Sequence, residues 1–513
     1  MSAAFNEYIS EGYTFKGPTI KLGGAVYQGE TQTGTFVEVP LQTMNRHGLI
    51  AGATGTGKTK TLQILAEQLA NEGVPCLLMD IKGDLSGIAQ ASGGHPKIDE
   101  RHEKIGFPFE ASGSTVELLS LSDEPGARLR ATVSEFGPVL ISKILDLTEV
   151  QEGIVAILFK YCDDHDMPLV DLADFRKVLQ YATQEGKEEI QKDYGRISSA
   201  STGAIMRKLI ALEQQGGDRF FGEPSFDIND LVRLDSQGRG IVSIIRLTDL
   251  QDRPQLFSTF MMSLLAEVYA GFPEIGDPER PELVIFIDEA HLIFSEASDA
   301  LLAQIESIIK LIRSKGVGIY FCTQNPADVP EDVLGQLGMK IQHALRAFTA
   351  KDRKAIKLAA QNFPLTDYYD TEELLTSMGI GEAMVTVLDE KGRPTPLVHT
   401  MLRAPQSRMD VLTEGEIKTL IKQSVLIPKY NQEIDRESAL ELLNKKIAAA
   451  KEEEQVERVK AQRTQAKRVS TRAKKDPTLI EELSKNTMVR QLGRTVAREL
   501  TRGLLGVLGV KRR

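Results

Sequence analysis

A glycine-rich segment in the first eighth of the chain has the residue types and spacing of a phosphate-binding loop. It fits G-x-x-x-x-G-K-[ST], in which glycines let backbone N–H groups surround phosphates and the following helix adds a partial positive charge. The lysine would contact the β- and γ-phosphates, and the hydroxyl after it would bind Mg²⁺. The segment consists of Gly52, Ala53, Thr54, Gly55, Thr56, Gly57, Lys58 and Thr59.

The residues on both sides of this segment match the elements that must position it. An apolar run over 47–51 predicts a strand, and 61–70 predicts a helix. A glycine-rich turn without a ligand can fit the same pattern, but strand and helix rarely flank such a turn in this order. The sequence therefore predicts binding of a nucleoside triphosphate.

A second segment indicates that the nucleotide is hydrolysed. Residues 283–287 are all apolar, as expected for a strand buried on both faces. At its end, Asp288 could hold Mg²⁺ through water, and Glu289 could polarise the attacking water. The alternative is that both acids only cap the next helix. The phosphate loop elsewhere in the chain favours the catalytic interpretation.

A third segment, 316–324, predicts another apolar strand that ends in polar residues. Ligands of open α/β sheets bind at this end of the strands. Gln324 could therefore sense the γ-phosphate or hold the attacking water, although many strands without such a role end in Thr-Gln.

Two acids after a predicted strand over 75–80 should also lie near the nucleotide. Asp80 and Asp84 belong to a segment that matches the D-x-x-G motif of GTPases. The Asn/Thr-Lys-x-Asp guanine signature is missing, however, and 283–288 offers a better Mg²⁺ strand. These observations favour ATP over GTP as the nucleotide.

Composition indicates an ordinary globular protein with two or three domains, since 41% of the 513 residues are hydrophobic. We expect no secretory signal over 1–10 and no membrane span. Cys76, Cys162 and Cys322 lack paired or metal-ligand spacing, which favours buried thiols in a reducing, cytoplasmic location.

The net charge of −10 is unevenly distributed. From 445 onwards, 19 Lys and Arg face 8 Asp and Glu, a net charge of +11, which leaves −21 on residues 1–444. This distribution argues against a globally basic nucleic-acid binder and restricts any polyanion contact to a central channel or to the tail.

The order of elements predicts an α/β fold with a mostly parallel sheet, because strands alternate with helices. Segments 383–388 and 395–402 predict a hairpin at the edge of the sheet. The predicted divisions are a short β element over 1–45, a P-loop ATPase core over 46–137 and 235–404, an inserted helical subdomain over 138–234, and a helical, basic C-terminal extension over 405–513.

The tail contains two different segments. Residues 451–475 are charged, which predicts a solvated helix or a disordered linker. Residues 489–508 have an apolar stripe and arginines at every fourth position, typical of a basic amphipathic helix. We expect it to pack against protein; a membrane surface or DNA are the alternatives, and the absence of Phe, Tyr and Trp in it disfavours the membrane.

Together these motifs resemble the HerA–FtsK superfamily of ring-forming P-loop ATPases, most closely its YjgR-like branch, whose members carry a HerA-type ATPase domain. The segments that carry the resemblance are 47–59, Asp80-Ile81-Lys82-Gly83-Asp84, 287–291, 323–330, 429–430 and 435–439.

The resemblance implies a RecA-like fold, a hexameric ring with ATP sites between subunits, and a central pore for double-stranded DNA. It also implies a trans-acting arginine, for which Arg313 fits best and Arg346 is the reserve candidate. Without the resemblance, Arg313 would be an exposed cation at a helix end.

One departure concerns partners. HerA proper has an N-terminal barrel that docks a nuclease, whereas about 45 residues precede the loop here, so we do not expect a nuclease partner.

Asp-Glu-Ala-His at 288–291 also suggests a superfamily-two helicase, but the second lobe of that class is not found. Two functions stay open: an ATP-driven DNA translocase, helicase-like in action, or an ATP-gated oligomeric scaffold that recruits effectors without moving along DNA.

Overall fold

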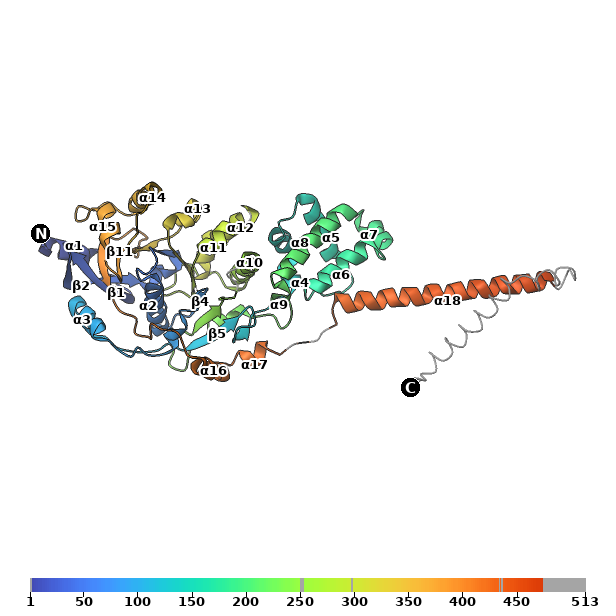
Figure 1. Cartoon of the computed structure of the whole chain (residues 1–513), viewed down its shortest axis with the longest axis horizontal. Helices are drawn as coiled ribbons and strands as arrows, with labels where there is room; N and C mark the ends of the chain where they lie inside the picture. Colours follow the sequence, from blue (N-terminus) through green and yellow to red (C-terminus); the bar gives the residue numbers. More distant parts are fainter. Residues whose placement is uncertain (1, 250–252, 297–298, 433, 435–436, 474–513) are drawn as a thin grey trace. The chain divides into compact units, whose positions relative to one another are not determined.

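The computed structural model describes residues 2–249, 253–296, 299–432, 434 and 437–473 (Figure 1). The chain divides into two compact units, Met1–Ala439 and Leu440–Arg513. The first unit continues past residue 405, where the sequence places the start of the extension. The reason is that residues 406–408 contact the helix that follows the phosphate-loop motif. In that helix, the Glu67 carboxylate accepts from the N–H groups of Gln406 and Ser407 at 2.7 and 3.1 Å.

Among the described residues, twelve strands form one sheet. In spatial order they are β2 (Glu30–Pro40), β1 (Thr19–Tyr27), β12 (Val398–Leu402), β11 (Glu382–Thr386), β10 (Met339–Gln342), β3 (Gly48–Ala51), β9 (Val317–Thr323), β8 (Leu283–Ile287), β4 (Cys76–Asp80), β7 (Val242–Arg246), β5 (Val116–Ser120) and β6 (Ala127–Arg128).

The strands from β10 to β6 are parallel to one another, which confirms the predicted mostly parallel α/β sheet. Every residue of β3, β9, β8 and β4 is buried, because helices cover both faces of this part of the sheet. Ala51 pairs with Thr323, and Ile287 pairs with Phe321. The carboxyl ends of β3, β9 and β8 therefore lie at one edge of the sheet.

The other part of the sheet is antiparallel and differs from the prediction. β11 and β12 form the expected hairpin, but the prediction that it lies at the sheet edge is wrong, because β1 pairs with β12 and β2 pairs with β1. Strands β5 and β6 were also not predicted. The spacing of apolar residues within one segment does not show with which distant strand that segment will pair.

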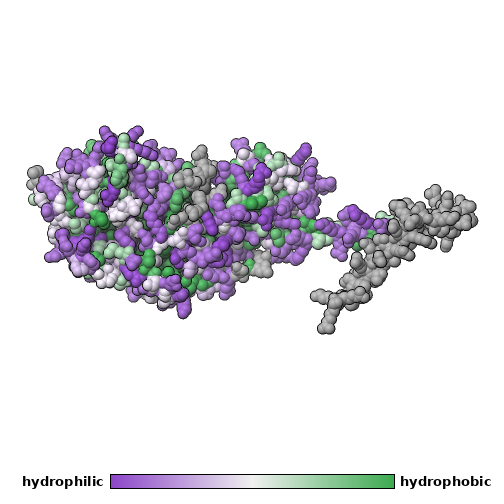
Figure 2. Space-filling model, viewed as in Figure 1, coloured by the Kyte–Doolittle hydropathy of each residue, from purple (hydrophilic) through white to green (hydrophobic). Residues whose placement is uncertain are grey.

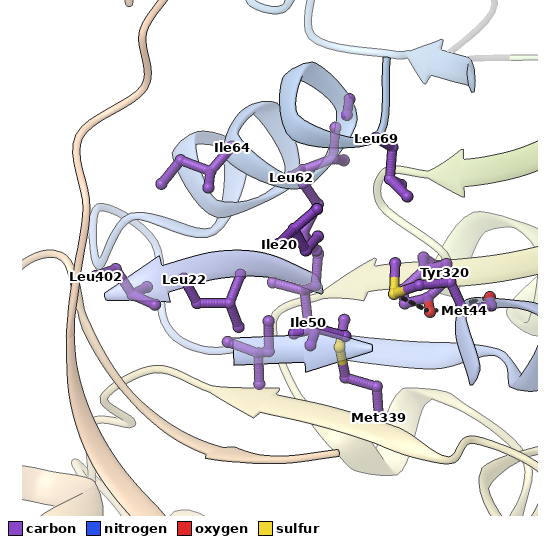
Figure 3. Close-up of a cluster of buried hydrophobic side chains, with 14 of the residues drawn as sticks. Ile20, Leu22, Met44, Ile50, Leu62, Ile64, Leu69, Tyr320, Met339 and Leu402 are labelled. Carbon is purple, nitrogen blue, oxygen red and sulfur yellow. Dashed lines mark hydrogen bonds between the residues drawn. The ribbon is translucent and has the colours of Figure 1, made fainter. Parts of the chain in front are cut away.

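One helix, α2 (Lys58–Asn71), packs in the core against strands from both parts of the sheet. α2 directs Leu62 and Leu69 towards Ile50 of β3 and Tyr320 of β9, as Figure 3 shows. The Tyr320 hydroxyl is not left unpaired in this apolar cluster, since it donates to the Met44 carbonyl at 3.1 Å. The segment that carries the phosphate-loop motif thus leads directly into a helix with ten buried residues.

A group of helices lies between β6 and β7 in the sequence. Four of the six helices were predicted, and α7 and α9 were not. α7 is short and charged, and its single buried residue, Ile190, gives no periodicity. α9 has only four residues. The bounds are α4 (Val133–Ile144), α5 (Glu149–Asp164), α6 (Leu172–Thr183), α7 (Lys187–Tyr194), α8 (Ser199–Gln214) and α9 (Gly217–Phe220).

The remaining helices of the first unit follow the strands or lie beside them. They are α1 (Ser2–Gly12), α3 (Pro96–Ile105), α10 (Pro254–Gly271), α11 (His291–Glu296), α12 (Asp299–Ile312), α13 (Glu331–Leu334), α14 (Ala350–Gln361), α15 (Thr371–Ser377), α16 (Glu414–Gln423) and α17 (Ile427–Tyr430).

The second unit contains α18 (Ala439–Ala473), whose side chains over 451–464 are almost all exposed. Of the two alternatives for this stretch, a helix is the one observed, and it continues to Ala473. The amphipathic helix predicted over 489–508 lies outside the described residues. None of the described helices combines the length and the apolar character needed to cross a bilayer. The face of the first unit in Figure 2 is correspondingly polar over most of its surface, with small apolar patches between polar residues.

A buried histidine beside β3 should make the fold sensitive to acid. The Nδ1 of His47 accepts from the Ile319 N–H at 3.0 Å, and Nε2 donates to the Ile309 carbonyl at 2.8 Å. Burial lowers the pKa of His47 from 6.5 to about 4. The unfolded chain therefore binds a proton more readily, and His47 contributes stability above about pH 6.5 that is lost as the pH falls towards 4.

We expect this histidine alone to remove about 2 kcal/mol of the free energy of unfolding between pH 7 and pH 5. Urea unfolding of the wild type and of His47→Gln at both pH values measures the effect, since glutamine does not titrate. Equal pH dependence in the two proteins would contradict this role. Glu67 changes the pH dependence of the free energy of unfolding in the opposite direction, because burial raises the pKa of its carboxyl to about 7. Glu67 is present in both proteins, so their comparison isolates the effect of His47.

Candidate nucleotide site

The phosphate-loop motif forms a turn whose backbone needs glycine. Gly52, Gly55 and Gly57 have φ values of 154°, 79° and 114°, which side chains rarely tolerate. A Cβ on Gly52 would also lie 2.5 Å from the Cβ of His343. The loop is held by neighbouring strands, because the Gly52 and Ala53 N–H groups donate to carbonyls at the ends of β9 and beyond β10 at 3.3 and 2.9 Å. The loop is thus fixed before any ligand arrives.

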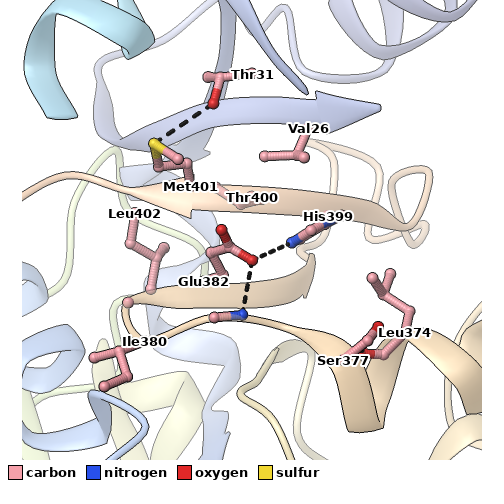
Figure 4. Close-up of polar contacts among 12 residues, drawn as sticks. Val26, Thr31, Leu374, Ser377, Ile380, Glu382, His399, Thr400, Met401 and Leu402 are labelled. Atoms are coloured by element: carbon pink, nitrogen blue, oxygen red, sulfur yellow. Dashed lines mark hydrogen bonds and ion pairs between the residues drawn. The ribbon is translucent and has the colours of Figure 1, made fainter. Parts of the chain in front are cut away.

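The turn before β11 supports the loop from the other side. The Gly381 N–H donates to the Thr56 carbonyl at 3.0 Å. Next to it, the Glu382 carboxylate accepts from the Gly379 N–H at 2.9 Å and lies 3.0 Å from His399 Nε2, as Figure 4 shows. This antiparallel hairpin therefore shapes the predicted phosphate site, a role that its own sequence does not indicate.

Lys58 and Thr59 are the first two residues of α2, so both lie at the positive end of that helix. The Lys58 ammonium is largely buried and donates to the Ala53 carbonyl at 3.2 Å, across the mouth of its own loop. Burial lowers the pKa of Lys58, while the Glu289 and Asp288 carboxylates act in the opposite direction. A phosphate would replace the carbonyl as a stronger, charged acceptor.

Asp288 directly follows β8 and is 1% exposed. Within the described part of the chain, its Oδ2 has no hydrogen-bond partner. Burial raises the pKa of this carboxyl, while the charge of Lys82 acts in the opposite direction, as a bound cation also would. An orphaned carboxylate oxygen on the edge that also carries Thr59 is the donor set that suits a hydrated Mg²⁺. The residues present therefore fit the metal that the sequence predicted.

Glu289 has a backbone conformation that is unusual for glutamate, with φ at +48°. Its side chain is 6% exposed, forms an ion pair with Lys82 and lies 3.2 Å from His291 Nδ1. In the region that the structure describes, neither carboxylate oxygen accepts from a backbone N–H of α11. The geometry therefore favours the catalytic interpretation over the helix cap that was the alternative.

Asp80 is the last residue of β4, at the strand end where the sequence predicted it. Its carboxylate accepts from the N–H groups of Gly83, Asp84 and Leu85 at 2.7, 3.1 and 3.2 Å. Burial raises its pKa to about 6. Asp80 thus shapes the loop after β4 rather than facing a nucleotide directly, and that loop carries Lys82.

Comparison with known proteins identifies this arrangement. A family model described as "Helicase HerA-like C-terminal" matches residues 26–513. The chain belongs to this HerA-like family. It is a P-loop ATPase of the HerA–FtsK class, as the resemblance implied.

Individual relatives agree with this assignment. "DNA double-strand break repair helicase HerA" of Sulfurisphaera tokodaii is 23% identical over 390 residues, which are 74% of this chain and 69% of that protein. HerA of Sulfolobus acidocaldarius is 20% identical over 354 residues, 68% of this chain and 64% of the relative. The chain thus spans about two thirds of the length of these relatives.

The fold itself has a solved counterpart. The bacterial conjugative coupling protein TrwBdeltaN70, in its unbound monoclinic form, superposes with a TM-score of 0.50 at 14% identity. The match covers 80% of this chain and 94% of that chain. It confirms the RecA-like P-loop fold of this HerA-like chain.

Gln324 of the HerA-like chain is exposed at the carboxyl end of β9, on the same edge as the loop. Thr323 beside it is buried and donates to Asp328 at 2.6 Å. Of the two polar residues at this strand end, Gln324 is therefore the one with a free path to a ligand.

Arg313 lies at the other end of β9, in the short helix η4 (Arg313–Lys315). β9 has seven residues, so at about 3.3 Å per residue its ends are roughly 20 Å apart. The structure therefore does not bring Arg313 to the loop of its own subunit. Its guanidinium instead pairs with Asp277 at 2.9 Å, and Asp277 also pairs with Arg46 at 3.2 Å. The reserve candidate, Arg346, is exposed beyond β10, on the same edge as the loop.

Sequence reasoning missed three contributors to this geometry. Lys82 was quoted only as part of a motif, and Asp277 was not considered. His343 lies beneath the loop, where its Nε2 is 2.9 Å from the Thr61 hydroxyl and burial lowers its pKa to about 4. The sequence could have identified His343, since it is a polar residue directly after β10, as Asp288 is after β8.

Proposed function

We propose that this HerA-like ATPase is the subunit of a hexameric ring motor that acts on double-stranded DNA as a translocase or helicase-like enzyme. The observation that carries the proposal is the separation of Arg313 from the loop by the length of β9. A ring in which the amino edge of one sheet meets the carboxyl edge of the next would supply the missing cation. The names of the relatives, a break-repair helicase and a conjugative coupling protein, support DNA as the partner.

Within one subunit, the loop N–H groups and Lys58 would bind the phosphates of ATP. Thr59 and Asp288 would hold Mg²⁺, which when bound neutralises charge on the phosphate oxygens. Glu289 would accept a proton from the attacking water, and Gln324 would orient that water. Arg313 of a second copy would stabilise the charge that develops as the terminal phosphate leaves.

The proposal extends to the compartment. Cys76, Cys162 and Cys322 are free and buried, which supports a reducing environment and hence the cytoplasm.

The motor is tested by measuring ATP hydrolysis with and without duplex DNA, together with the mass in solution. A several-fold stimulation by DNA in a particle of six subunits is expected. Hydrolysis that DNA leaves unchanged would instead support the ATP-gated scaffold, and a monomeric mass with full activity would contradict both.

Lys58→Ala should abolish binding of ATP. The lysine is the charged group nearest to the expected β- and γ-phosphates, and alanine leaves their charge uncompensated. Titration with a fluorescent ATP analogue measures the affinity, with thermal unfolding as the check that the variant is folded. Unchanged affinity in the folded variant would refute the phosphate-loop assignment.

A further inference from the structure

The loop after β4 holds a lysine rigidly at the edge of the sheet where the nucleotide site lies. The three hydrogen bonds to the Asp80 carboxylate fix the backbone of 83–85. Gly83 has a φ of 77°, and a Cβ there would lie 2.9 Å from Thr248 Cγ2, so the loop packs too closely to shift easily. The backbone of Lys82 is therefore fixed, and only its long side chain is free to change partners.

Lys82 and Glu289 form an ion pair whose two members differ in accessibility. The Glu289 side chain is 6% exposed, whereas that of Lys82 is 40% exposed. The carboxylate is confined by its surroundings and by its positive φ, but the ammonium can reach solvent or a ligand. When this pair breaks, Lys82 is the member that moves.

The ion pair also limits what the Glu289 carboxylate can contact. While the Lys82 ammonium lies against Oε1, that oxygen is not available to a water molecule. A second lysine is occupied in a comparable way, since Lys58 donates to the Ala53 carbonyl. Lys58 and Lys82 thus both have acceptors from the protein itself.

We propose that Lys82 is a nucleotide-sensing residue that exchanges the Glu289 carboxylate for the terminal phosphate of a bound nucleoside triphosphate. The inference rests on the proposed ATPase site. A triphosphate brings more negative charge than one carboxylate, so it attracts the exposed ammonium. The exchange frees the Glu289 carboxylate to contact a water molecule only when a terminal phosphate is present. After that phosphate leaves, the ion pair forms again.

A double-mutant cycle tests the exchange without measuring turnover. The affinities for ADP and for a non-hydrolysable ATP analogue, both with Mg²⁺, are compared in the wild type, Lys82→Met, Glu289→Gln and the double variant. Lys82→Met should weaken the ATP analogue about ten-fold or more and leave ADP unchanged, because a charge-assisted hydrogen bond to the terminal phosphate is lost.

Glu289→Gln should tighten the ATP analogue several-fold, because Lys82 no longer has to leave a carboxylate. This gain must disappear in the Lys82→Met background. The same gain in both backgrounds would overturn the proposal, since it would reflect simple repulsion between carboxylate and phosphate. Equal weakening of ADP and the ATP analogue by Lys82→Met would also overturn it.

Two controls separate this inference from the function on which it rests. Lys104→Met removes the same charge from a surface pair with Glu100 and should bind both nucleotides like the wild type. Lys58→Ala should lose both nucleotides. If Lys58→Ala binds normally, the site itself is wrong and the exchange falls with it; if it does not, a flat result for Lys82→Met overturns the exchange alone.

Discussion

Arg313→Ala is expected to leave binding of ATP intact while the rate of hydrolysis falls by about 10³–10⁵-fold. An arginine finger acts on charge that develops in the transition state, so its loss affects turnover far more than affinity. Steady-state hydrolysis and nucleotide titration together measure the two quantities. Arg280→Ala is a matched control, because Arg280 is a nearby arginine that donates to the Glu72 carbonyl at 2.9 Å and has no expected role.

The position of Arg313 makes a sharper test possible. In rings that contain both Arg313→Ala and Lys58→Ala subunits, some interfaces combine an intact loop with an intact arginine. Activity should therefore reappear on mixing, although each variant alone is inactive. If verified mixed rings stay inactive, Arg313 acts within its own subunit or only maintains structure through Asp277.

Glu289→Gln is expected to keep Mg²⁺–ATP bound and to slow hydrolysis by about 10²–10⁴-fold, the usual effect of removing a general base. Glutamine keeps the shape of the side chain but cannot accept the proton. Single-turnover hydrolysis by prebound ATP measures the chemical step directly. Glu282→Gln is the control, since Glu282 is exposed just before the opposite end of β8. Normal turnover in Glu289→Gln would mean that this acid has no part in the chemistry.

The sequence could predict the parallel core because each of its strands is a short apolar run that ends in polar residues. Parallel strands bring such ends to one edge, so the loop, Asp288, Glu289 and Gln324 could be placed together before any coordinates were known. The pattern is local, and the inference needs no knowledge of distant pairing.

What could not be predicted depends on contacts between distant segments. The N-terminal strands β1 and β2 extend the sheet beyond the hairpin that was predicted at the edge, because β1 pairs with β12. The ion pair of Lys82 with Glu289, and that of Asp277 with Arg313, likewise join segments that no periodicity relates. The hydrogen bonds of Asp80 could not be predicted either, because a carboxylate at a strand end can accept from its own loop as well as face a ligand.

The left-handed backbone at Glu289 lowers the stability of the fold at a position that we expect to be needed for activity. A non-glycine residue at φ of +48° costs about 1–3 kcal/mol, and this one also carries a buried charge. Selection for stability alone would favour glycine here, which adopts this φ without strain. The role in hydrolysis proposed for Glu289 would account for an acid at a position where the fold alone favours glycine. The surrounding helices and strands must then be stable enough to hold one residue in a conformation that it would not adopt by itself.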